Sequence, residues 1–94
     1  MPKNTDVPCP KGVPTQLTDT AVAAARVVGS QGFYLCATLT ATPPTSYAGA
    51  VPMLPHSVLA EDMALGDLFP GVGDTVILWA WPTGAAISVS VSHS

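Results

Sequence analysis

The side chains that most often bind metals are few in this chain, and their spacing does not suit a metal site. Neither His56 nor His93 belongs to a His-x-x-x-His motif, and no Cys-x-x-Cys pair accompanies them. The two imidazoles could share a metal with Glu61 or Asp62, but we interpret both histidines as surface side chains. The sequence therefore predicts no metal site.

Catalytic groups are equally sparse. Ser30 lies in Gly29-Ser30-Gln31-Gly32, which lacks the Gly-x-Ser-x-Gly spacing and the strand-to-helix context of a nucleophile elbow. Gly71-Val72-Gly73 is not followed by the lysine of a phosphate-binding loop. The carboxylates of the second half are not spaced at every second residue, as calcium ligands are, and we interpret them as parts of a solvated loop: Glu61, Asp62, Asp67 and Asp74. We expect no catalytic residue, no cofactor and no enzymatic activity.

The two cysteines, Cys9 and Cys36, could form one disulfide. The chain begins Met-Pro-Lys-Asn-Thr-Asp, without the apolar segment of a secretory signal, so we expect synthesis in the cytoplasm. Thiols stay reduced in that compartment, which favours two free cysteines over a disulfide.

Composition restricts the kinds of partner. With 94 residues the chain has room for one domain, and only 10% of the residues are charged, against roughly 25% in ordinary soluble domains. A surface so poor in charge predicts that another protein covers part of it. The net charge of −3, with three basic residues, argues against binding to nucleic acid. The apolar runs are far shorter than the roughly 20 residues of a membrane span, so we expect no membrane partner.

The chemistry-bearing residues would have to be positioned by β-strands. Alternation of residues between two faces, bounded by turn residues, predicts six β segments: 15–18, 21–28, 32–42, 50–54, 75–81 and 85–92. The alanines of the second segment also allow a helix, but the following Gly29-Ser30-Gln31-Gly32 favours a hairpin between 21–28 and 32–42. A short helical turn is expected at 65–69. The pattern predicts an all-β fold, a small β-sandwich or barrel-like domain of about six to eight short strands.

Residues 1–14 form a proline-rich segment before this β domain of residues 15–94. Four prolines exclude a helix or a central strand, so we expect an extended N-terminal arm. A disordered tail is one interpretation. The other is an arm that docks on a partner protein through its apolar and proline residues: Val7, Pro8, Pro10, Val13 and Leu17.

Trp79 and Trp81 lie two residues apart in an expected strand and so point to the same face. They could fill the core of the sandwich, as buried aromatic side chains usually do. Alternatively, they are anchors for a partner protein, because Trp is enriched at interface hot spots. The opposite face, with Val76, Leu78 and Ala80, could then supply the core.

With these features together, the chain resembles the small decoration (cement) proteins on the capsids of tailed bacteriophages. The likeness lies in the short length, the proline-rich arm, the Ala/Thr/Val/Gly-rich β domain and the low charge. In addition, Gly84-Ala85-Ala86-Ile87-Ser88-Val89 is similar to the apolar strand that closes the lambda-type decoration proteins.

This resemblance implies a structural virion protein on the capsid surface, assembled in the host cytoplasm. Its partners would be major capsid protein subunits and further copies of itself, as a dimer or trimer, and it would hold neighbouring capsid subunits together. Two alternatives stay open. One is a tail, neck or head-fibre component, and the other is a carbohydrate-binding module with Trp79, Trp81 and Tyr47 as a stacking platform.

Overall fold

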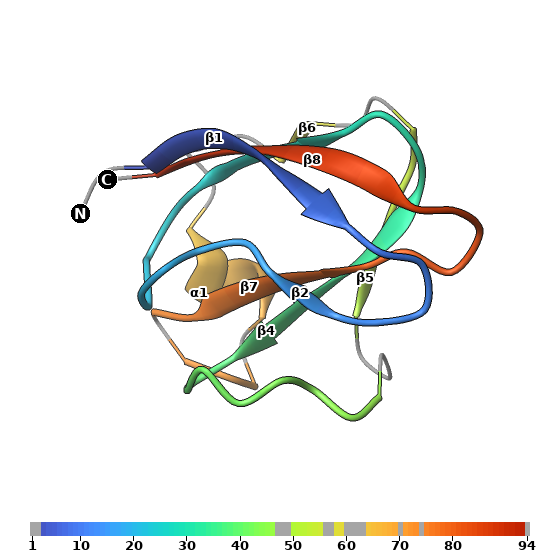
Figure 1. The fold of residues 1–94 in the computed structure, drawn as a ribbon. Coiled ribbons are helices and arrows are strands. Elements are labelled where there is room, and N and C mark those ends of the chain that lie inside the picture. Colours follow the sequence, from blue (N-terminus) through green and yellow to red (C-terminus); the bar gives the residue numbers. More distant parts are fainter. Residues whose placement is uncertain are drawn as a thin grey trace.

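The computed structural model describes residues 3–46, 50–55, 58–59, 64–69, 71–73 and 75–93. Within these ranges the chain is an all-β protein in which two four-stranded antiparallel sheets face each other as a small β-sandwich (Figure 1). The predicted fold class is confirmed. The predicted helical turn is also present, as the short helix α1 (Leu65–Leu68). None of the described helical residues belongs to a helix that is long and apolar enough to cross a bilayer.

The sandwich consists of sheet I, whose longest strands are an edge strand and its neighbour, and sheet II, whose longest strands are the two central ones. Sheet I has the order β1 (Lys3–Cys9), β8 (Ile87–His93), β3 (Arg26–Gly29) and β6 (Val58–Leu59). Sheet II has the order β2 (Thr15–Gln16), β7 (Ile77–Trp81), β4 (Phe33–Thr38) and β5 (Val51–Met53).

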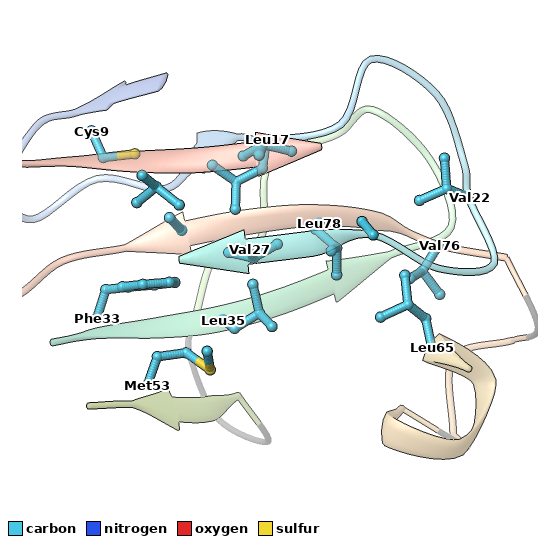
Figure 2. Packing of buried hydrophobic residues seen from close by; sticks show 14 of the residues in the cluster. Cys9, Leu17, Val22, Val27, Phe33, Leu35, Met53, Leu65, Val76 and Leu78 are labelled. Carbon is cyan, nitrogen blue, oxygen red and sulfur yellow. The ribbon is translucent and has the colours of Figure 1, made fainter. Parts of the chain in front are cut away.

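The main hydrophobic core lies between the sheets and follows the alternation of the sequence. In β8, Ile87, Val89 and Val91 are buried while Ser88 is exposed, as predicted. Sheet II contributes Leu35 and Leu78 from its central strands, with Leu17 beside Leu78 just after β2. Sheet I contributes Val27 to the same cluster (Figure 2). Full burial of each such side chain contributes about 1.5–3 kcal/mol to stability.

The predicted hairpin between residues 21–28 and 32–42 is wrong. β3 pairs with β8 and β6 in sheet I, whereas β4 pairs with β7 and β5 in sheet II. Residues 29–32 therefore carry the chain from one sheet to the other, so that Val27 and Leu35 can both face the same core. The crossing is tight, because a Cβ atom on Gly29 would lie 2.5 Å from the ring of Phe33.

The alanine-rich segment before β3 forms neither a helix nor a long strand. Val22 makes an isolated bridge with Val76, and regular pairing begins only at Arg26. Between them, the carbonyl of Ala23 accepts a hydrogen bond of 2.8 Å from the backbone N–H of Leu65. This bond occupies one of the donors that a helix N-terminus leaves without an intrahelical partner, and it fixes α1 against the sandwich.

The proline-rich segment is extended, as expected, but it is continuous with the β domain. All seven residues of β1 pair with β8, from Lys3 opposite His93 to Cys9 opposite Ile87. Proline excludes a central strand but is compatible with an edge strand, and β1 is an edge of sheet I. Within the described residues, the first part of the proline-rich segment is therefore an edge strand of sheet I.

Candidate binding surfaces

An aromatic row crosses the outer face of sheet II. Tyr34 of β4 pairs with Trp81 of β7 on one side and with Pro52 of β5 on the other, so the three side chains share a face. Trp81 and Tyr34 are half-buried, and Pro52 is exposed. We call Trp81, Tyr34 and Pro52 the aromatic row. A flat apolar strip of this kind offers contact area without a reactive group.

The segment before β2 lies beside one end of this row. The backbone N–H of Gly12 donates a 2.7 Å hydrogen bond to the carbonyl of Pro82, the residue after Trp81. Val13 is 46% exposed at this point. The proline-rich segment therefore brings an exposed apolar residue near the end of β7.

A small second hydrophobic cluster adjoins the row. Trp79, Ile77 and Cys36 are buried on the outer face of sheet II, and Ala50 and Trp81 pack against them. The indole N–H of Trp79 donates to the hydroxyl oxygen of Thr38 at 2.8 Å. The Thr38 hydroxyl in turn donates to the carbonyl of Thr40 at 2.7 Å. This chain of hydrogen bonds fixes the position of Trp79 and the start of the loop after β4.

Beside Tyr34 and Pro52 the surface is hollowed. An open depression with a volume of about 340 Å³ is lined in part by Tyr34, Pro52, Gln31 and Thr83. It combines an aromatic ring with amide and hydroxyl groups. The arrangement could hold a small polar ligand against the ring of Tyr34, or a side chain of a docked protein.

The outer face of sheet I has a different character. Ser88, Ser90 and Ser92 follow one another along β8, and Arg26 donates a 3.3 Å hydrogen bond from Nη2 to the hydroxyl oxygen of Ser90. The sequence predicted these serines as outward-facing. The outer face of sheet I therefore combines serines and Arg26 with the valines Val28 and Val58, and the aromatic row lies on sheet II.

The residues predicted to bind a partner are divided between the core and the surface. Leu17 is fully buried between the sheets, Val7 packs against the same core, and Trp79 is 4% exposed in the outer cluster. The remaining four present surface: Pro8, Pro10, Val13 and Trp81. Of these, Trp81 belongs to the aromatic row, and Val13 follows Gly12, which bonds to Pro82 just after β7. Pro8 lies on β1 in sheet I and Pro10 just after it.

Sequence reasoning did not single out Tyr34 and Pro52 as binding residues. The signal was present, because the alternation of residues 32–42 placed Tyr34 on the same face as Cys36. What it lacked was the pairing of β4 with β7 and β5, which sets Tyr34 between Trp81 and Pro52.

Both cysteines are free, the arrangement that the sequence favoured. Cys9 points into the main core and Cys36 belongs to the cluster outside sheet II, so that sheet lies between the two thiols. Burial raises the pKa of the Cys9 thiol from 9.0 to about 11, and a hydrogen bond with Thr15 opposes part of this rise. Burial also raises the pKa of Cys36. Neither thiol is activated as a nucleophile.

The remaining candidates for chemistry give no constellation within the described ranges. His93 was interpreted as a surface residue, but it is buried at the end of β8, and that interpretation is wrong. His56, Glu61, Asp62 and Asp74 lie outside the described residues, as do Tyr47 and the side chain of Asp67. Among the residues that the structure describes, no three His, Cys, Asp or Glu side chains are grouped to hold a metal ion.

Comparison with known proteins supplies no relative. The sequence matches no protein-family model, and it has no significant match among curated proteins or solved structures.

Proposed function

We propose that this chain is a structural virion protein without catalytic activity, which binds the outside of a phage capsid and holds neighbouring subunits together. The aromatic row is the surface that makes the contact. The capsid as partner comes from the sequence resemblance to decoration proteins, and the row is the feature of the fold that supports a protein-binding role.

The observation that carries the proposal is the half-exposed Trp81, which lies beside Tyr34 on the outer face of sheet II. The strands of this sheet contain no charged residue. Trp and Tyr are enriched at the centres of protein interfaces, where they bury large area at small cost in conformational entropy. The buried Trp79 packs beside Trp81 and is fixed by its bond to Thr38, so this side of the row is held in place before a partner arrives. Pre-ordering of this kind favours binding because little freedom is then lost.

The scarcity of charge supports the same role. A decoration protein that binds as a dimer or trimer makes several linked contacts with the capsid, so each contact can be weak. An apolar row on a domain with 10% charged residues is suited to contacts of this type.

The test is cosedimentation of the chain with capsids assembled without it. Trp81→Ser should lower the amount bound at least about tenfold, as expected for an interface hot spot. Val28→Ser, a similar apolar-to-serine change on the outer face of sheet I, should bind like the unaltered chain. The melting temperature of each variant shows that both are folded. The proposal would be refuted if the unaltered chain did not cosediment with the capsids, or if Trp81→Ser cosedimented as well as the unaltered chain.

A carbohydrate-binding module is the second candidate, and the depression beside Tyr34 favours it. Trp79 is buried and cannot stack on a sugar, so a platform would consist of Tyr34 and Trp81 with the polar groups of Gln31 and Thr83. Glycan binding that is lost on Trp81→Ser, in a chain that does not bind capsids, would support this candidate. A tail, neck or head-fibre component would use the same protein contacts, and a handful of copies per particle in place of hundreds would identify it.

A further inference from the structure

We propose that β1 is a self-association edge, at which two copies of the chain pair antiparallel across a two-fold axis at Thr5 and join their first sheets into one continuous sheet. This inference concerns sheet I and does not depend on the proposed function, which uses the outer face of sheet II.

β1 differs from the other strands at the sheet edges. β2, β5 and β6 are also edge strands, but they have two or three residues, whereas β1 has seven. Long edge strands present rows of backbone donors and acceptors to other chains, and proteins usually shorten or block them. Among the strands that the structure describes, β8 is the one that pairs with β1.

Pro8 shows which backbone groups of β1 face the open edge. Pro8 pairs with Ser88 but has no N–H, so this position cannot exchange hydrogen bonds with β8. In an antiparallel ladder, residues that bond to one neighbour alternate with residues whose N–H and C=O point away from it. Asn4 and Asp6 have the same parity as Pro8. Their N–H and C=O groups therefore point away from β8.

The side chains at this end of β1 are also uncovered. Thr5 pairs with the buried Val91 and so points to the core side of sheet I, yet it is exposed. Asn4 and Asp6, on the outer side, are exposed as well. The Thr5 hydroxyl donates a long hydrogen bond of 3.5 Å to the Asp6 carbonyl, whose second lone pair can still accept a bond from another chain. Both faces of the strand end are therefore open beside the free backbone groups.

The positions of the free donors select one register for a second copy. If Asn4 lies opposite Asp6 of the other copy, each pair exchanges two bonds, and the two-fold axis makes four bonds in total. An axis at Asp6 would place two carboxylates directly opposite each other and would set Asn4 opposite Pro8, which has no N–H to donate. An axis at Asn4 would leave the Asp6 groups beyond the described strand. The register with its axis at Thr5 is thus the one that uses every free donor of β1.

Side chains in this register are complementary. The carboxylate of Asp6 lies beside the amide of Asn4 of the other copy, which can donate to it, and this pair occurs twice. The two Thr5 side chains lie directly opposite each other, and threonine pairs of this kind stabilise antiparallel sheets. The two Asp6 carboxylates are diagonal neighbours, about 7–8 Å apart, and not direct partners.

Sedimentation equilibrium of the full chain, at concentrations up to about 1 mM, tests the proposal. The unaltered chain should form dimers. Asp6→Pro removes the outward N–H without removing a bond to β8, just as Pro8 does, so the variant should stay folded. Loss of two donors per dimer should raise the dissociation constant at least about tenfold. Asp6→Ala keeps the N–H and should change the constant by no more than about threefold.

Disulfide trapping tests the register. Opposite residues in a non-hydrogen-bonded pair have Cα atoms about 4.5 Å apart, within the range of a disulfide. Thr5→Cys should therefore give a covalent dimer under mild oxidation, while Gln31→Cys, an exposed position between β3 and β4, should not. A chain that is monomeric throughout, or an Asp6→Pro variant that dimerises like the unaltered chain, would overturn the proposal. The proposal would also be overturned if the chain were monomeric and the Asp6→Pro variant bound capsids more weakly than the unaltered chain. The edge of β1 would then pair with a strand of another protein and not with a second copy.

Discussion

The hydrogen bond between Trp79 and Thr38 should contribute more to stability than its place outside the main core suggests. Thr38→Val removes the acceptor of the Trp79 indole N–H, which is held at 2.8 Å in a side chain that is 4% exposed. A buried donor left without a partner costs about 1–3 kcal/mol. The second bond of the hydroxyl, to the Thr40 carbonyl, adds little because Thr40 is exposed and water can replace the donor.

The expected loss is therefore about 2 kcal/mol. For a domain of this size 1 kcal/mol corresponds to about 4–8 °C, so the melting temperature should fall by about 8–16 °C. Thermal unfolding followed by far-UV circular dichroism measures this shift. Near-UV circular dichroism, which senses the packing of the indoles, should weaken in the same variant.

Thr38→Ser is the matched control. It keeps the hydroxyl that accepts from Trp79 and donates to Thr40, and it should lose less than about half of what Thr38→Val loses. If Thr38→Val and Thr38→Ser both melt at the same temperature as the unaltered chain, the hydrogen bond from the Trp79 indole to Thr38 does not contribute to stability. The reasoning that Trp79 is fixed by this bond would then be refuted.

Two further results should follow from the position of β1 and Cys9. Deletion of residues 1–9 should destabilise the domain by at least about 2 kcal/mol, because β8 loses a seven-residue neighbour and Cys9 and Val7 leave the core; an unchanged melting temperature would contradict this role of β1. Because the folded state holds the Cys9 proton up to a pKa of about 11 against 9.0, its contribution to stability is complete below pH 9 and should fall by up to about 2 kcal/mol as the pH rises to 10.5. Urea unfolding at pH 8 and pH 10.5 measures this loss, which should be smaller in Cys9→Ala, and an equal loss in both chains would count against it.

The role of β1 changes how loss of binding after an N-terminal deletion is interpreted. A chain without residues 1–14 would lack an edge strand of sheet I, and weaker binding would report a damaged sandwich as readily as a lost contact. Substitutions at exposed positions separate these causes. Trp81→Ser and Asp6→Pro each change one outer surface and leave the described backbone pairing in place.

Local signals in the sequence accounted for the class of fold. The alternation in residues 85–92 and 32–42 identified β8 and β4, because side chains on successive strand residues point to opposite faces. The same rule identified β7 as apolar on both faces. It could not say which face met the core, because Trp79 and Leu78 are both apolar and only their neighbours distinguish them.

Strand pairing decided the rest. Residues 29–32 have the composition of a hairpin turn, yet β3 and β4 lie in different sheets because each finds longer partners elsewhere, β8 for one and β7 for the other. The prolines of residues 1–14 excluded a helix and a central strand, but they did not exclude an edge strand. Sequence alone thus determined that the chain is a charge-poor β domain with tryptophans on one strand face. Only the tertiary structure made β1 an edge of sheet I and set Trp81 beside Tyr34, because pairing between distant segments depends on the whole core and not on the local period.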